Sequence, residues 1–231
     1  MFSGSLLEIR QLEFSSSQAI RENCYPYWWS RSQEVLGMIG KASLLEAIAG
    51  KNRGLLATET DKLAILALVA QLEDRNPTPR PTEAADLLDG NWRLLYTTSS
   101  ELLGIDNVPL FKLGQIYQCV RVKDSKIYNI AEVGGLPYLE GIISVTATFT
   151  PVSERRVKVI FDRAISGLQR FIGYQSPDQY IQQIESGKKF FGIDFNIQNP
   201  NQKGWVDITY LDEDLRISRG NEGSVFVLTR N

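Results

Sequence analysis

The segment GNWRLLYT, Gly90–Thr97, decides the fold class, because from this point the apolar residues recur at every second position. Three side chains share one side of the segment and three share the other: Trp92, Leu94 and Tyr96 against Arg93, Leu95 and Thr97. A period of two is that of a β-strand, whose successive side chains point to opposite faces. The segment therefore predicts a strand with one preferred inner face.

The same period continues towards the C-terminus. Further strand-like segments, rich in β-branched and aromatic residues, are separated by turns. They are residues 115–122, 126–134, 141–152, 155–165, 190–197, 204–212, 214–220 and 224–230. Such a series must close or stack, since an open sheet would leave free edges and a bare apolar face. We therefore predict a mainly β fold, an antiparallel barrel of about eight or nine strands within residues 88–230.

Closure into a barrel assigns inner faces to individual strands. The predicted inward side chains of two central strands are Ile143, Val145, Ala147 and Phe149, and then Val157, Val159 and Phe161. Tight reversals at residues 212–214 and 220–223 predict that the last three strands form an antiparallel meander. An eight-strand barrel has an interior just wide enough for side chains or for one small ligand.

Residues 41–76 precede the strands and predict a helical hairpin. Its first helix ends at Gly50, a typical C-terminal cap, and the second begins at an N-cap within residues 58–61. The proline-rich stretch at 74–81 forbids its continuation. The expected buried side chains are Leu44, Leu45, Ile48, Leu63, Leu66, Ala67 and Ala70.

Residues 1–40 show no sustained period and are treated as an N-terminal extension. Two interpretations are open. Translation could begin at Met38, just before the helical pattern sharpens, which makes the upstream residues an artefact. Alternatively the extension is real, and its aromatic side chains pack on the domain or contact a membrane interface. These side chains are Tyr25, Tyr27, Trp28 and Trp29.

The composition argues against several classes of function. The 231 residues include no His, the usual general base and the commonest transition-metal ligand, and Cys24 and Cys119 form no C-x-x-C pair. The acidic run at 212–214 lacks the glycine and the distal glutamate of a calcium loop, so we expect no metal and no cofactor. A formal net charge of −2 without a basic block argues against a nucleic-acid partner. No nucleophile elbow, P-loop or dinucleotide motif appears, and we expect no enzyme.

Three stretches are specific in combination: LLDGNWRLLYTTS at 87–99, ITYLDEDLRISRGNEGSVFVL at 208–228, and RGLLATETDKLAILALVAQLEDRNP at 53–77. Together they resemble the plastid-lipid-associated protein or fibrillin family of plastids and photosynthetic prokaryotes, over about residues 41–230. That family is similar to lipocalins, whose strands open with Gly-x-Trp and whose barrels enclose apolar ligands. The resemblance implies a lipocalin-like barrel that binds or shields a quinone, a carotenoid or an acyl lipid such as a fatty acid. It also implies peripheral attachment to thylakoid membranes or lipid globules, from the plastid stroma or a prokaryotic cytoplasm.

The predicted ligand site combines inward strand residues with motif positions that the resemblance marks. It consists of Trp92, Leu94, Tyr96, Val145, Phe149, Val159, Phe161, Phe195, Tyr210, Asp212, Arg216 and Arg219. Trp92 either closes the barrel floor, beneath a cation from Arg219 or Arg230, or simply fills core volume. Asp212 and Arg216 form either an ion pair across a tight bend or a polar handle for a ligand head group.

The segment from Arg170 to Lys189 interrupts the strands. Ser176 as a cap and Pro177 at the first helical position predict a short amphipathic helix, flanked by aromatic residues and by lysines. The segment is a lid over the barrel mouth, a foot on a lipid surface, or an ordinary insertion packed on the barrel. The loop at 99–111 leaves the same choice.

Three functions stay open at the level of sequence. We favour a non-catalytic lipid-associated protein that holds a small hydrophobic molecule. The second is an enzyme like the bilin lyases, similar barrels that pass a tetrapyrrole to a protein cysteine. The third is an interaction module whose barrel is filled by its own side chains. An enclosed apolar cavity distinguishes the first from the third.

Overall fold

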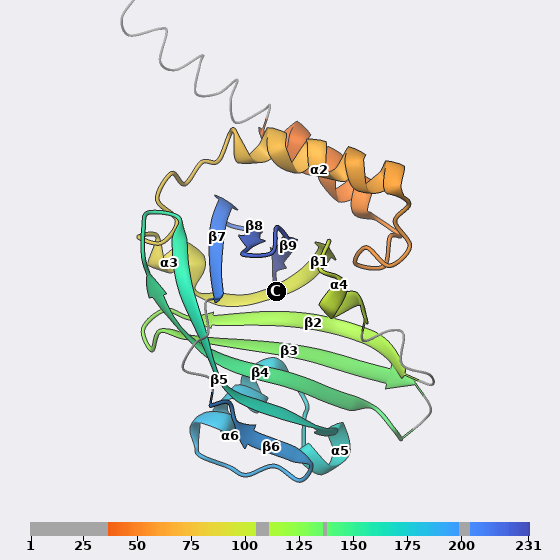
Figure 1. Cartoon of the computed structure of the whole chain (residues 1–231), viewed down its shortest axis with the longest axis vertical. Coiled ribbons are helices and arrows are strands. Elements are labelled where there is room, and N and C mark those ends of the chain that lie inside the picture. Colours follow the sequence, from red (N-terminus) through yellow and green to blue (C-terminus); the bar gives the residue numbers. More distant parts are fainter. Residues whose placement is uncertain (1–36, 105–110, 136–137, 199–203) are drawn as a thin grey trace, which may run out of the picture. The chain divides into compact units, whose positions relative to one another are not determined.

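The computed structural model describes residues 37–104, 111–135, 138–198 and 204–231. The chain divides into two units, Met1–Ser43 and Leu44–Asn231, and the second contains the sheet. A helix at 37–48 ends within this unit. The other elements are α2 (Glu59–Glu73), α3 (Ala85–Leu88), β1 (Gly90–Thr97), α4 (Ser100–Leu103), β2 (Phe111–Arg121), β3 (Lys126–Gly135), β4 (Gly141–Pro151), β5 (Arg156–Leu168), α5 (Gln169–Ile172), α6 (Pro177–Glu185), β6 (Ile193–Asn196), β7 (Gly204–Leu211), β8 (Leu215–Gly220) and β9 (Val225–Arg230) (Figure 1).

Eight antiparallel strands close into a barrel. Their order around the ring is β1, β2, β3, β4, β5, β7, β8 and β9, and β9 pairs with β1. The first part of β5 pairs with β7 at residues 156–159, and its second part pairs with the short strand β6 at 163–166. The predicted mainly β barrel is confirmed, with β6 as an additional strand beside the ring.

Two of the four register irregularities among the described strands, those on β1 and β7, direct a tyrosine to the outside of the barrel. From Leu94 to Tyr96, β1 advances by two residues while its partner β9 advances by only one, so β1 carries an extra residue. Strand β7 carries an extra residue in the same way between Ile208 and Tyr210. An extra residue moves every following side chain to the other face. Leu94 and Ile208 therefore lie in the barrel core, whereas Tyr96 and Tyr210 pack outside with the helices. The prediction that Trp92, Leu94 and Tyr96 share an inner face is wrong for Tyr96.

The helical residues cover this outer surface of the barrel. Ile65, Val69 and Leu72 of α2 pack with Leu44 and Ile48 on the bulged strands (Figure 1). A capping box fixes the start of α2, because the Thr58 hydroxyl accepts from the Asp61 amide and the Asp61 carboxylate accepts from the Thr58 amide. The expected buried stripe was wrong at four positions: Leu63 is 71% and Leu45 is 38% exposed, and Ala67 and Ala70 are exposed as well. The run at 63–72 is apolar on all sides, so its period does not define the buried face.

The insertion after β5 packs against the opposite outer wall, which belongs to β3, β4 and β5. Helix α6 begins at Pro177, capped by Ser176 as predicted, and buries Tyr180, Ile181 and Ile184. These side chains form a second outer core with Tyr128, Ile130, Ile142 and Ile165 of the barrel. The Tyr180 hydroxyl shares a 2.7 Å hydrogen bond with Ser144, which explains why a polar residue of β4 is buried. Most of the apolar face of the insertion thus covers a wall.

Among the residues described, no helix is both long enough and apolar enough to span a bilayer. Helix α4 accounts for the start of the loop at 99–111, with Ser99 as its cap. Residues 105–110 of that loop, and the predicted N-terminal extension with its aromatic cluster, lie outside the described residues apart from 37–40.

Candidate ligand cavity inside the barrel

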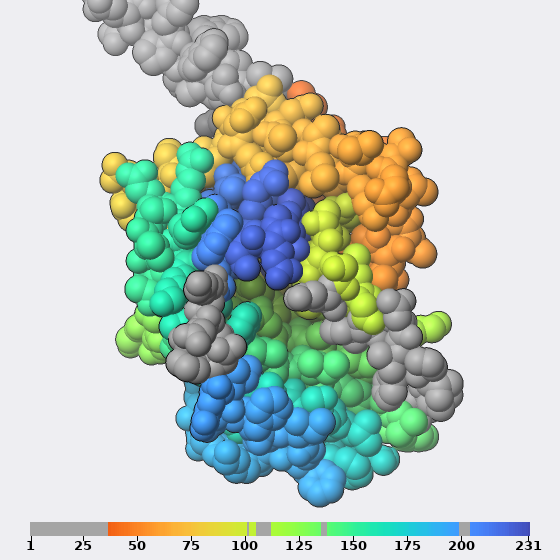
Figure 2. Space-filling model, in the orientation of Figure 1, coloured from red at the N-terminus to blue at the C-terminus, as the bar shows by residue number. Residues whose placement is uncertain are grey.

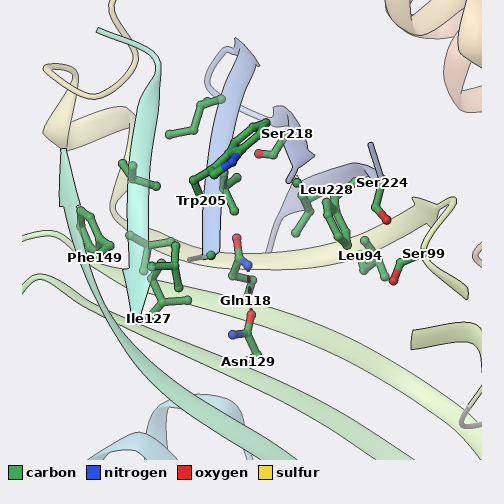
Figure 3. Close-up of a pocket in the computed structure, with 18 of the residues that line it drawn as sticks. Leu94, Ser99, Gln118, Ile127, Asn129, Phe149, Trp205, Ser218, Ser224 and Leu228 are labelled. Atoms are coloured by element: carbon green, nitrogen blue, oxygen red, sulfur yellow. Dashed lines mark hydrogen bonds between the residues drawn. The ribbon is translucent and has the colours of Figure 1, made fainter. Parts of the chain in front are cut away.

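A cavity of about 570 Å³ lies inside the barrel. Its volume is within the range of about 300–1,000 Å³ that is usual for small-molecule sites. The walls are predominantly apolar, and a few polar groups reach in from β2, β3 and β8 (Figure 3). The apolar wall includes Leu88, Leu94, Leu102, Ile116, Val120, Ile127, Val145, Phe149, Val157, Val159, Phe161, Trp205, Val206, Ile208, Phe226 and Leu228.

One end of the barrel is closed around Trp92. The ring is fully buried, and its Nε1 donates to the Leu88 carbonyl at 3.0 Å. The guanidinium of Arg230 lies 4.6 Å from the ring centroid. Arg230 is held there by the backbone carbonyls of Leu87, Asp89 and Glu213. Trp92 and Arg230 therefore form the predicted floor with its cation.

The conformation of Gly90 makes room for this arrangement. Its φ is +132°, a region essentially restricted to glycine, and a Cβ at this position would lie 2.8 Å from Nη1 of Arg230. Gly90 and Trp92 of the opening motif are thus both explained by the position of Arg230. Arg219, the other candidate cation, is instead on the outer face and donates to Glu73 of α2 at 2.7 and 2.8 Å.

Three polar side chains form a connected group inside the cavity. Arg216 is 2% exposed, lies 4.9 Å from the Trp92 ring centroid, and donates through Nη2 to Oε1 of Gln118. Gln118 in turn donates through Nε2 to Oδ1 of Asn129 at 3.0 Å. Burial lowers the pKa of the Arg216 guanidinium from 12.5 to about 9. The group places donors and a buried positive charge in apolar surroundings.

The opposite end of the cavity is open. Its mouth is lined by Ser99, Trp205 and the β8–β9 turn with Asn221 and Glu222, and Figure 2 shows a hollow in this face below β7–β9. Phe161, also a lining residue, is 37% exposed there.

The inner face extends past this mouth onto β6. Val145 pairs with Ala164, which pairs with Phe195, and Ile143 pairs with Ser166, which pairs with Ile193. Directly paired residues project to the same side of a sheet. Ile193 and Phe195 are exposed, so an apolar lip continues the inner wall.

The structure brings together half of the predicted site. Six of the twelve predicted residues line the cavity: Leu94, Val145, Phe149, Val159, Phe161 and Arg216. Trp92 does not line the cavity itself, but its ring lies next to the lining residue Arg216. Tyr96 and Tyr210 lie on the helix side because of the bulges, and Phe195 lies on the exposed lip. Arg219 also faces the helices.

Asp212 has a role in the β7–β8 turn. Its carboxylate accepts from the amides of Asp214 and Leu215 and from the Tyr210 hydroxyl, at 2.8, 2.6 and 2.8 Å. Among the described residues no ion pair joins it to Arg216, which turns into the barrel. The prediction of an Asp212–Arg216 pair is therefore wrong, because the turn ends one residue before Arg216 and alternation directs Arg216 inward.

Sequence reasoning missed the polar members of the cavity. Gln118, Asn129 and Ser218 reach it from the middle of strands. The sequence did contain a signal, because these polar residues share their side of the strand with apolar lining residues. Gln118 lies between Ile116 and Val120 at a spacing of two, and Asn129 is two residues after Ile127. Polar residues within a strand are more commonly assigned to the solvent face.

Comparisons with known proteins agree with this architecture. A family model described as PAP_fibrillin matches residues 38–229. The chain belongs to the PAP_fibrillin family. A light-induced chloroplastic protein of Solanum tuberosum is 35% identical over 217 residues, which cover 82% of this chain and 66% of that protein. A chromoplast-specific carotenoid-associated protein of Cucumis sativus is 34% identical, with 82% and 67% covered, and plastoglobulin-1 of Pisum sativum is 34% identical, with 82% and 60% covered. No solved structure matches the chain.

The PAP_fibrillin match includes every residue that lines the cavity, since these lie between Leu88 and Leu228. The chain spans about two thirds of the length of the potato relative. The resemblance recognised in the motifs is thus confirmed at the level of the family.

The described part of this PAP_fibrillin chain offers little reactive chemistry. No three His, Cys, Asp or Glu side chains in it are grouped to hold a metal ion. Cys119 is a buried free thiol in the outer wall beneath the insertion, and burial raises its pKa to about 12. A thiol of that pKa is almost entirely protonated near neutral pH and is a poor nucleophile.

Proposed function

We propose that this protein binds a small hydrophobic molecule inside its barrel and acts as a non-catalytic, lipid-associated protein. The observation that carries the proposal is the apolar cavity of about 570 Å³ within a closed barrel. Candidate ligands are a quinone, a carotenoid or a fatty acid. The volume also argues against the alternative in which the barrel is filled by its own side chains.

The energetics of such binding are favourable. Burying about 400 Å² of apolar ligand surface contributes roughly 10 kcal/mol. Association costs about 4 kcal/mol or more, so about 6 kcal/mol or less is left, a dissociation constant of tens of micromolar or weaker. One hydrogen bond to a charged group adds about 1.5–3 kcal/mol, which gives low-micromolar affinity. An apolar body with one polar end therefore suits this cavity better than a pure hydrocarbon.

The names of the relatives support a location at lipid structures of plastids or photosynthetic membranes. One relative is named for association with carotenoid and another as a plastoglobulin. In this chain Phe171 and Phe191 are 51% and 75% exposed, and their rings contact each other with centroids 5.5 Å apart. Arg170 directly precedes Phe171, and Lys189 lies two residues before Phe191. Exposed aromatic rings with basic neighbours suit peripheral attachment to an anionic lipid surface.

A substitution that fills the cavity tests the proposal. Val145 lines the cavity, so Val145→Trp should obstruct it, whereas Val152→Trp adds the same side chain at a position that is 64% exposed. The measurement is the dissociation constant for ubiquinone, β-carotene and palmitate by quenching of tryptophan fluorescence or by calorimetry. We expect Val145→Trp to weaken binding at least about tenfold, the equivalent of 1.4 kcal/mol, and Val152→Trp to leave it unchanged.

Two outcomes would contradict the proposal: the wild-type protein binds no member of the panel, or Val145→Trp binds as tightly as the wild type. The alternative of a bilin-lyase-like enzyme predicts transfer of a bilin to an acceptor protein, and the same preparations can be assayed for it.

A further inference from the structure

We propose that the cavity recognises amphiphiles with a terminal carboxylate, such as long-chain fatty acids, and that Arg216 and Asn129 bind the head group. This inference rests on the proposed function and names the ligand class of the same site. It is carried by the juxtaposition of a buried guanidinium, a fixed amide donor and an apolar chamber.

Arg216 is a buried cation, and no carboxylate of the described residues forms an ion pair with it. Its Nε has no hydrogen-bond acceptor among the residues that the structure describes, and its only polar side-chain partner there is the neutral Gln118. A charge removed from water is costly unless it is paired and hydrogen-bonded. Three arginines of the described barrel, unlike Arg216, have carboxylate partners, and these pairs lie on its outside: Arg156–Asp207, Arg163–Asp194 and Arg219–Glu73.

A second positive charge lies at the same floor. Arg230 and Arg216 are 4.6 and 4.9 Å from the centroid of the same Trp92 ring, and the proximity of Arg230 also contributes to the lowered pKa of Arg216. The acid that lines the cavity within the described residues is Glu222, which is exposed in the β8–β9 turn. The closed end therefore favours an anion.

The Gln118 amide fixes the orientation of Asn129. Because Oε1 of Gln118 accepts from Arg216, its Nε2 must donate, and Oδ1 of Asn129 accepts that bond. The Nδ2 group of Asn129 is then available as a donor in the cavity wall. A head group at this position meets donors from both Arg216 and Asn129. A carboxylate only accepts hydrogen bonds and carries the compensating charge, whereas a neutral quinone carbonyl accepts without neutralising Arg216.

The remaining wall provides space for an acyl chain. Paired inner positions lead from Trp92 to Gln118, Asn129 and Val145, and then by way of Ala164 to the exposed Phe195. The row is polar at the closed end and apolar towards the lip. Figure 3 shows Gln118 and Asn129 at the centre of the cavity, with Phe149 and Ile127 to one side and Leu94 and Leu228 to the other. The carboxylate thus lies against this polar group, and the chain extends towards the mouth.

The test compares palmitate with methyl palmitate, which shares the chain but lacks the charge. Dissociation constants are measured by calorimetry on the full chain, on Arg216→Met and on Arg219→Met. Arg219→Met is the control, because Arg219 is on the same strand but its side chain faces the helices. Wild type and Arg219→Met should bind palmitate about tenfold tighter or more than the ester. Arg216→Met should bind both with similar constants and keep the ester affinity of the wild type.

Each outcome is decisive. Equal binding of acid and ester by the wild type, or an unchanged preference in Arg216→Met, overturns the carboxylate assignment and leaves the proposed function intact. Binding of neither palmitate nor its ester overturns the carboxylate assignment, and it overturns the proposed function as well if ubiquinone and β-carotene also fail to bind. A measurement on the wild type alone tests the assignment even if Arg216→Met does not fold. The pKa of the carboxyl group of bound ¹³C-labelled palmitate, followed by its NMR resonance, should be at least about one unit below the usual carboxylic acid value near 4.3. A raised carboxyl pKa contradicts the assignment.

Discussion

At the scale of residues, Trp92 connects closure of the barrel with the polar end of the cavity. Arg230 approaches the ring while bonded to three backbone carbonyls, and Arg216 approaches it from a strand that lines the cavity. The two arginines differ in their partners. Arg230 is satisfied by the backbone and stabilises the floor, whereas Arg216 has unused hydrogen-bonding capacity at Nε. Gly90 determines whether Arg230 can reach its position.

Gly90→Ala should destabilise the protein by about 1–3 kcal/mol, because it adds backbone strain at φ +132° and places Cβ 2.8 Å from the Arg230 guanidinium. Gly223→Ala is the matched control, with φ +76° and nothing within 4 Å of the added Cβ. It should cost only about 1–2 kcal/mol of left-handed backbone strain. Urea unfolding monitored by circular dichroism measures both. A smaller loss for Gly90→Ala than for Gly223→Ala would contradict this account of the motif.

At the scale of elements, alternation in sequence predicted the strands and the inner faces of β4 and β5. Val145, Phe149, Val159 and Phe161 line the cavity as alternation requires. It failed at Tyr96, because Leu95 is an ordinary strand residue that gives no sign of a bulge. Tyr210, which the family resemblance marked as a site residue, is directed outward by the bulge at Thr209. The cavity group was not predictable for a different reason. The pairing of Gln118 with Asn129 depends on the register of β2 against β3, which depends on tertiary contacts.

Packing of the insertion on β3, β4 and β5 buries tyrosine hydroxyls, which predicts an alkaline loss of stability. Burial is the main cause that raises the pKa of Tyr128, Tyr174 and Tyr180 above 10.0, that of Tyr180 to about 12. A hydrogen bond to Glu185 raises the pKa of Tyr128 further, and one to Glu132 does the same for Tyr174. The folded state keeps protons that the unfolded chain releases near pH 10, so stability is complete below pH 10 and falls above it.

Arg216 acts in the opposite direction. Its pKa of about 9 in the folded state is below 12.5. Between these pH values the folded protein has released a proton that the unfolded chain still holds, and this difference alone would increase stability as the pH rises. One arginine opposes at least three tyrosines. We therefore expect the free energy of unfolding to fall by at least about 1.4 kcal/mol between pH 10 and pH 11. Urea titrations at each pH measure it, and Tyr128→Phe should give a shallower slope. A constant free energy across this interval would show that these hydroxyls ionise freely in the folded state.

At the scale of the whole barrel unit, the open end and the exposed aromatic residues are adjacent in the chain. Ile193 and Phe195 form the lip that continues the inner wall, and Phe191 lies two residues before Ile193. The Phe171–Phe191 pair lies where α5 and the start of β6 flank the end of β5. A lipid surface that contacts these rings would lie near the lip. A ligand could then pass between membrane and cavity along an apolar surface with little exposure to water.

This arrangement predicts that Phe171→Ser with Phe191→Ser reduces membrane binding without affecting the cavity. Vesicles of neutral and anionic plastid-type lipids should retain the double variant at least about tenfold less than the wild type, since each lost ring forgoes up to about 1.5–3 kcal/mol of burial. Leu56→Ser with Leu63→Ser is the control, because these side chains are 65% and 71% exposed but belong to the helical region. Sedimentation with vesicles measures retention, and palmitate binding in solution should be unchanged in both double variants. Equal loss of retention in the control pair would indicate general hydrophobic adhesion. Undiminished retention of the phenylalanine variant would place the membrane contact elsewhere on the protein.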